Sequence, residues 1–255
     1  MQKMPVLFIG HGSPMNAIEE NRFSAQWKQL PTRIPRPQAI LSISAHWFTS
    51  GTKVTDSSAP KMIYDMYGFP DELYQVAYNA PGSPHFAAVT KELLKDRVQL
   101  DNTWGLDHGS WSVLRHIYPH ADVPVFQLSV DRLASAKTHY EIGRKLRTLR
   151  EQGVLILGSG NIVHNLARVT WDMDGGYHWA EEFDLYIKNR ILKRNLEDVI
   201  HFERAGTSSA FAFSTLDHFA PLLYILGASD ENDTVSVFND SCVLGALSMT
   251  SYLFG

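Results

Sequence analysis

Short apolar runs separated by longer amphipathic stretches form the main pattern of this chain. Five runs are apolar at nearly every position, and they cover residues 6–9, 39–43, 123–128, 154–157 and 235–238. Strands with one exposed face alternate apolar and polar residues, whereas strands covered on both faces are apolar throughout. The five runs therefore predict strands buried between two layers of helices.

The stretches between these runs have the spacing of helices. They predict helices near residues 85–97, 135–151, 179–197 and 215–226. Within 135–151 the apolar residues recur on one helical face, and Gly153 follows as a stop. Alternation of strands and helices predicts an α/β fold with a mixed, mainly parallel central sheet flanked by helices.

The sequence predicts one domain. No repeat, linker or shift of composition divides it, so we expect a single catalytic domain over residues 1–255. Residues 51–84, rich in Tyr, Pro, Gly and Asp, predict a long irregular segment. Such segments in compact domains are usually functional or mobile.

Composition and charge narrow the class of protein. A hydrophobic content of 44% and a charged content of 20% are typical of a globular domain, not of a disordered or fibrous chain. The net charge of −4 does not favour a nucleic-acid partner. No apolar run approaches the ~18 residues of a membrane span. The N-terminus lacks a secretory pattern and Cys242 has no partner cysteine, so we expect a cytoplasmic protein without a membrane or nucleic-acid partner.

Three of the eleven histidines come at or just past the ends of predicted strands. They are His11, His46 and His164, after the runs at 6–9, 39–43 and 154–157. The carboxyl ends of parallel strands meet at one edge of an α/β sheet, where ligands bind. Imidazole is the commonest protein ligand of zinc and iron. A lone histidine is more often structural, but three at equivalent positions favour a metal site at the C-terminal ends of the strands.

Two further histidines have informative neighbours. His108 lies in a glycine-flanked turn, where it suits orienting a substrate or transferring a proton, although an ordinary surface-turn histidine fits as well. His218 follows Asp217 and is expected in the first turn of the helix predicted over 215–226. A cation is unfavourable at a helix N-terminus, so a neutral, metal-bound imidazole is expected there. The remaining six lack such context: His85, His116, His120, His139, His178 and His201.

Five sequence blocks occur in the order found in a known enzyme family. They are GHGSP at 10–14, SAHW at 44–47, LDHGSW at 106–111, GSGNIVHN at 158–165 and LDH at 216–218. Together they resemble the class III extradiol ring-cleavage dioxygenases, and within that family the branch of 4,5-DOPA extradiol dioxygenases. The resemblance runs from residue 6 to about residue 250. It implies an α/β fold with one mononuclear metal ion.

The resemblance also implies roles for the histidines. The family's first two metal ligands correspond to His11 and His46, its catalytic acid/base to His164, and its histidine in the turn to His108. Better-known members complete the metal site with a glutamate, and here the matching region offers His218. Members of this branch bind zinc with His164 also at the metal, which implies a ligand set of His11, His46, His164 and His218.

The implied enzyme is an oxidoreductase that incorporates both atoms of O₂ into a catechol. L-DOPA, cleaved between carbons 4 and 5 to a muconate semialdehyde, is the implied substrate. Zinc is the expected bound ion, while Fe(II) is the ion expected to support O₂ chemistry, because zinc has no redox chemistry. The alternatives are a zinc-dependent hydrolase and a non-catalytic metal- or small-molecule-binding protein on the same scaffold. Consumption of O₂ separates the first reading from the other two.

Overall fold

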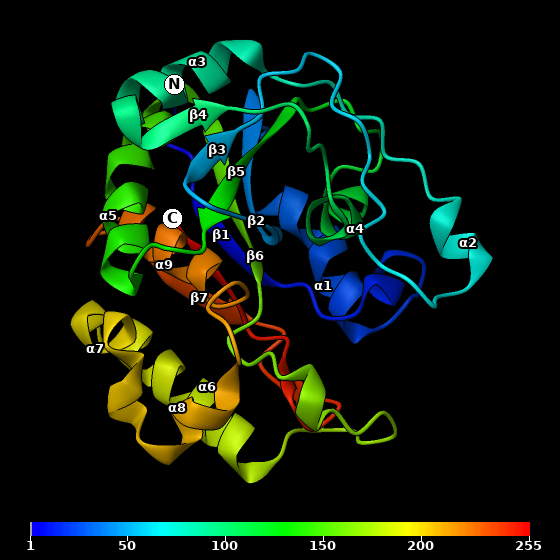
Figure 1. Ribbon diagram of the computed structural model, residues 1–255, viewed down its shortest axis with the longest axis vertical. Helices are drawn as coiled ribbons and strands as arrows, with labels where there is room; N and C mark the ends of the chain where they lie inside the picture. Colours follow the sequence, from blue (N-terminus) through cyan, green and yellow to red (C-terminus); the bar gives the residue numbers. More distant parts are fainter. Residues whose placement is uncertain (1) are drawn as a thin grey trace.

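The computed structural model describes residues 2–255, and its centre is a mixed sheet (Figure 1). The strands of this sheet are β1 (Val6–Gly10), β2 (Ala39–Thr49), β3 (Thr52–Val54), β4 (Val98–Leu100), β5 (Val125–Asp131), β6 (Val154–Gly160), β7 (Val235–Phe238) and β10 (Ser251–Phe254). They lie in the order β4-β3-β5-β2-β6-β1-β10-β7. Pairs β1–β6, β2–β5, β2–β6 and β3–β4 are parallel, and the other three pairs are antiparallel. The predicted mixed, mainly parallel sheet is confirmed.

Both faces of β1, β2, β5 and β6 are largely buried, which explains their apolar sequences. The prediction of burial on both faces is wrong for β7, an edge strand with three of its four residues half-buried. In β1, Val6 and Phe8 belong to one hydrophobic cluster, while Leu7 and Ile9 belong to another. Figure 1 shows helices α3 (Pro84–Leu94), α5 (Ala136–Leu146) and α9 (Ala220–Ala228) on one side of the sheet. Helices α1 (Arg22–Gln29) and α4 (His108–Ile117) lie on the other side. Because consecutive strand residues point to opposite faces, each of the two helical layers requires its own set of apolar side chains.

The remaining elements lie at the ends of the sheet. Helices α6 (His178–Leu192), α7 (Leu196–Ile200) and α8 (Thr207–Ala212) form a separate group, beside the small antiparallel pair β8 (Cys242–Val243) and β9 (Leu247–Ser248). The short helix α2 (Asp71–Tyr74) belongs to the predicted irregular segment 51–84, which also contains β3. Short 3-10 helices cover Pro14–Ala17, Leu30–Thr32, Lys95–Arg97, Arg147–Gln152, Leu166–Arg168 and Phe202–Ala205. Among residues 2–255, no helix has both the length and the apolar character needed to cross a membrane.

The helix predicted over 215–226 is wrong at both ends. It begins only at Ala220, where Pro221 in the first turn has no amide hydrogen to leave unpaired, and it continues through Gly227 to Ala228. Gly227 does not end the helix; it lies where α9 packs against α5. A Cβ at this position would lie 2.1 Å from the backbone oxygen of Tyr140, so the missing side chain lets α9 lie close against α5. His218 therefore precedes the helix and does not lie in its first turn.

The helix predicted over 179–197 divides into two. Helix α6 ends at Leu192 and α7 begins at Leu196. Between them Arg194 has a φ of 56°, a left-handed conformation that interrupts helical geometry. Helices α1, α2, α4 and α8 are absent from the predicted elements, and each has ten residues or fewer, which leaves little length for a periodic pattern.

The buried Arg150 side chain connects the residue stretches around Met4, Ala228 and Asp233. The Arg150 side chain is 1% exposed, and its guanidinium binds the Asp233 carboxylate through two contacts of 2.7 and 2.9 Å. It also donates to the backbone oxygens of Met4 and Ala228, at 2.6 and 3.0 Å. Removing one member of a buried ion pair leaves an uncompensated charge.

We therefore expect Arg150→Ala to lower the free energy of unfolding by about 3–5 kcal/mol. Urea denaturation followed by circular dichroism measures the change. Arg144→Ala is the matched control, because Arg144 pairs with Glu141 on the exposed surface, where such a pair contributes about 0–1 kcal/mol. Equal losses in the two variants would contradict this account of Arg150.

Candidate metal centre

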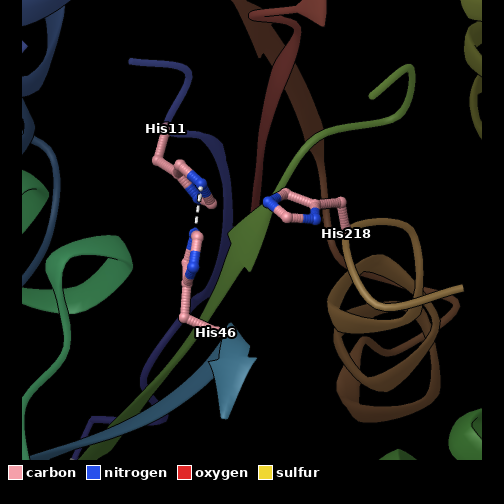
Figure 2. Close-up of side chains that lie close together, drawn as sticks. All are labelled: His11, His46 and His218. Atoms are coloured by element: carbon pink, nitrogen blue, oxygen red, sulfur yellow. Dashed lines mark hydrogen bonds between the residues drawn. The ribbon is translucent and has the colours of Figure 1, made fainter. Parts of the chain in front are cut away.

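Three histidines from distant parts of the sequence converge at one edge of the sheet. His11 follows β1, His46 lies in β2, and His218 lies in the turn before α9. Their ligating nitrogens all lie within 4.8 Å of one another. Figure 2 shows the rings of His11 and His46 facing each other, with the ring of His218 directed toward the space between them. This arrangement places three potential metal ligands around a common point.

The backbone explains how the three histidines meet. Strands β1 and β2 both pair in parallel with β6, so their carboxyl ends lie at the same edge. The sequence predicts His46 at or just past the end of its strand, but His46 lies within β2, which continues to Thr49. Its pairing with β5 shifts register between Ile43 and Phe48, and such irregularities redirect side chains.

The turn carrying His218 is held against the end of β6. The backbone oxygen of His218 accepts a hydrogen bond of 2.9 Å from the Asn161 amide. A Cβ on Gly160 would lie 2.1 Å from that same oxygen. Glycine at this position is therefore required for the close approach that brings His218 to the sheet.

The His11 ring has a defined tautomer. Its Nδ1 lies 2.9 Å from the Ser159 hydroxyl oxygen, and that hydroxyl donates its own hydrogen to the Gly109 carbonyl at 2.6 Å. The Ser159 oxygen must therefore accept from His11 Nδ1–H. This leaves the lone pair of His11 on Nε2, which is the nitrogen that faces His46.

Carboxylates beside Nδ1 favour the same tautomer in the other two rings. His218 Nδ1 lies 2.9 Å from Asp217 Oδ2, and His46 Nδ1 lies 3.0 Å from Asp65 Oδ2. A carboxylate beside Nδ1 favours a hydrogen on that nitrogen and leaves Nε2 as the donor to a metal. All three histidines thus offer Nε2 to the same point.

The spacing and chemistry of the three Nε2 atoms fit one divalent cation. The Nε2 atoms of His11 and His46 lie 3.1 Å apart. Zinc–nitrogen bonds of about 2.0–2.1 Å place two ligands of one ion about 3.0–3.4 Å apart. The Nε2 of His218 is buried and has no hydrogen-bond partner among the described residues, which a bound cation would satisfy.

Burial and neighbouring charges set the protonation states of the site. Burial, followed by the surrounding histidines, lowers the pKa values of His11 and His218 well below the usual range, so both rings are neutral at pH 7. Burial opposes the charged form of His46 too, but its contact with Asp65 outweighs this and raises its pKa. A proton on His46 Nε2 accounts for the 3.1 Å hydrogen bond to His11, and a metal cation would take the place of that proton.

The other two histidines singled out from the sequence lie directly beside this group. His164 stacks on His218, with ring centroids 3.4 Å apart and ring planes 2° from parallel. His108 is buried, and its ring centroid lies 3.9 Å from that of His46. Its predicted turn is the first turn of α4, which the Asp107 side chain caps by accepting from the Ser110 amide. All five histidines of the predicted site are thus brought together, although His164 is not among the three whose nitrogens converge.

Asp65 is the residue that sequence reasoning missed. It belongs to the irregular segment 51–84, and its carboxylate contacts both His46 and His108 at 3.0 and 3.1 Å. Burial would raise the pKa of Asp65, but the two histidines outweigh it and hold the pKa well below its usual range. No spacing in the sequence relates Asp65 to either histidine, so only the path of the chain in space could identify it.

Comparisons with known proteins agree with the geometry. Residues 5–255 match the family described as the catalytic LigB subunit of aromatic ring-opening dioxygenase. A protein of Escherichia coli K12 named 4,5-DOPA dioxygenase extradiol is 44% identical over 99% of this chain and 95% of its own length. One of the same name from Beta vulgaris is 37% identical over 97% and 95%. The crystal structure of an uncharacterized Escherichia coli K12 protein, 41% identical, has a TM-score of 0.87 over 99% of this chain and 100% of that one.

We expect His11→Ala, His46→Ala and His218→Ala each to lose bound metal, because each removes one of three converging donors. The measurement is metal content by mass spectrometry after dialysis against one equivalent of zinc. His178→Ala is the control, since its side chain is 96% exposed and lies outside the converging group. A variant that retains one ion per chain would remove its histidine from the ligand set.

Proposed function

This chain belongs to the LigB family of aromatic ring-opening dioxygenases, and from that premise we propose that it cleaves L-DOPA between carbons 4 and 5. The product would be a muconate semialdehyde that contains both atoms of O₂. The convergence of the Nε2 atoms of His11, His46 and His218 carries the proposal. The names of the relatives from Escherichia coli and Beta vulgaris support L-DOPA as the substrate. A family match over residues 5–255 supports one catalytic unit spanning the chain.

His11, His46 and His218 would hold one divalent metal ion through Nε2. When bound, Fe(II) supplies the electron transfer to O₂ and acidifies the catechol hydroxyl, whereas Zn(II) supplies only the second effect. The three nitrogens come from one edge of the sheet, and ligands grouped in this way leave adjacent positions for a substrate.

His164 is the proposed acid/base. Burial, the largest cause, lowers its pKa to about 4, so the ring is neutral at pH 7 and able to accept a proton. Its stacking on His218 keeps it within reach of a substrate bound at the metal centre. It would take up one proton from the catechol and return one as the ring opens. Of the two roles that the sequence predicts for His164, the stacked position outside the converging nitrogens supports this one over that of a fourth ligand.

His108 is the proposed substrate-orienting residue. Its Nδ1 lies against Asp65, which leaves Nε2 available to a substrate hydroxyl or to O₂. Its ring centroid is 5.7 Å from that of His11, and His108 lies outside the group of His11, His46 and His218. It forms a second group with His46 and Asp65, whose ligand atoms also lie within 4.8 Å of one another. From this position it would orient the catechol and shield it from water.

A zinc-dependent hydrolase is the second candidate. It is favoured by one observation, that the group of His11, His46 and His218 includes no carboxylate, unlike the neighbouring group of His46, Asp65 and His108. An all-nitrogen ligand set suits zinc at least as well as iron, and a zinc-bound water is a strong nucleophile. The two candidates differ in whether O₂ is consumed.

We expect metal-stripped protein to consume O₂ with L-DOPA after anaerobic reconstitution with Fe(II), and not after reconstitution with Zn(II). An oxygen electrode together with absorbance of the yellow product measures one O₂ per ring opened. Uptake with other catechols but not with L-DOPA would contradict the substrate alone. Failure of both metal forms to consume O₂ with any catechol, despite full metal binding, would contradict the dioxygenase and favour the hydrolase.

We expect His164→Ala to lower kcat by about 10²–10⁴-fold while it retains one metal ion per chain, because an acid/base is lost and no ligand is removed. Turnover at saturating Fe(II), with metal content measured on the same sample, tests this. His120→Ala, on the exposed surface, is the control. Unchanged kcat would exclude the acid/base role, and lost metal would identify His164 as a ligand instead.

A further inference from the structure

One carboxylate lies against two histidines of the site. Asp65 Oδ2 lies 3.0 Å from His46 Nδ1 and 3.1 Å from His108 Nδ1. Its other oxygen, Oδ1, accepts a hydrogen bond of 2.9 Å from the backbone amide of His108. The Asp65 side chain is only 12% exposed, and its Oδ2 meets the two rings in close ion-pair contacts without forming a hydrogen bond among the described residues. A single side chain thus contacts one of the converging histidines and the histidine beside them.

The backbone around Asp65 is held in place by the segment that leads into α4. The Ile63 amide donates to the Leu106 carbonyl at 2.7 Å, two residues before His108. The indole nitrogen of Trp111, in α4, donates to the Ile63 carbonyl at 3.0 Å. Asp65 therefore keeps a defined position relative to α4, although it belongs to an irregular segment.

We propose that Asp65 is a positioning residue that aligns His46 with the metal and His108 with the catechol through one shared carboxylate. The part that concerns His108 rests on the proposed function, while the part that concerns His46 rests on the ligand geometry alone. Asp65 Oδ2 lies against Nδ1 of both rings, and a carboxylate in this position favours the tautomer that keeps a hydrogen on Nδ1. The lone pair on each Nε2 is then directed to a different target.

The negative charge of Asp65 also matters for the metal centre. Three neutral imidazoles add no negative charge to a divalent cation. Asp65 and Asp217 each contact the Nδ1 of a converging histidine, so their two negative charges would help to balance the charge of a bound cation. A carboxylate in this position makes the imidazole a stronger donor. Asp217 contacts only His218 in this way, which makes it the natural comparison.

Asp65→Asn tests the alignment with almost no change of shape. If the amide oxygen accepts from the His108 backbone, the amide nitrogen replaces Oδ2 and donates to both rings. His46 would then carry its hydrogen on Nε2, where the metal needs a lone pair. If the amide is reversed, its N–H group opposes the His108 amide hydrogen. Either orientation disrupts one contact that the carboxylate satisfies.

The first readout is metal affinity, which does not depend on turnover. Competition with a chromophoric chelator measures the Kd of Zn(II) for the wild type, Asp65→Asn and Asp217→Asn. Loss of such a partner weakens metal binding by about 10–100-fold, and we expect this range for both variants. Thermal melting of the metal-free proteins reports whether the fold is intact. An Asp65→Asn affinity within about twofold of the wild type would overturn the proposal.

The second readout separates the two carboxylates. At saturating Zn(II), the absorbance change of 4-nitrocatechol measures catechol binding without any reaction. We expect the loss caused by Asp65→Asn to vanish in a His108→Ala background, because Asp65 acts through His108, whereas the loss caused by Asp217→Asn persists there. Losses of Asp65→Asn and His108→Ala that multiply would overturn the shared-carboxylate proposal.

Neither readout requires L-DOPA to be the substrate, so failure of the proposed function leaves this test valid. If Asp65→Asn does not fold, Asp65→Glu replaces it, because the longer carboxylate cannot keep all three contacts. We then expect metal affinity and nitrocatechol binding to fall together. An Asp65→Glu protein that retains both would overturn the proposal.

Discussion

Three imidazoles can present Nε2 lone pairs to one point only if the opposite nitrogen of each ring has a hydrogen-bond acceptor. Ser159 and Asp217 are these partners for His11 and His218, and the Asp65 carboxylate lies 3.0 Å from Nδ1 of His46. Without them each buried ring would be free to carry its hydrogen on either nitrogen, and the converging atoms would not form a donor set. The centre is therefore as much a property of its surrounding hydrogen bonds as of the three histidines.

These hydrogen bonds depend in turn on the sheet. Ser159 lies in β6, between the strands that lead to His11 and carry His46. Parallel pairing brings the three strand ends to the same edge of the sheet. Gly160 then allows the turn of His218 to come within hydrogen-bond distance of β6. Packing of the core thus determines the distances at the metal centre.

The long segment between β3 and α3 extends the site beyond the sheet. It has little regular structure of its own, yet its contacts with Leu106 and Trp111 place Asp65 between His46 and His108. One part of the chain therefore contributes to both proposed tasks, holding a metal and orienting a substrate.

The fold class and four of the strand starts could be predicted from local sequence, because buried strands need runs of apolar residues. The same holds for His11, His46, His108, His164 and His218, because each lies in a distinctive short motif. Three features became visible only in the folded chain: His46 lies within β2, His218 precedes α9, and Asp65 joins the site. Those features arise from contacts between residues far apart in the chain, such as Gly160 with His218 and Asp65 with His108, and no local pattern records such contacts.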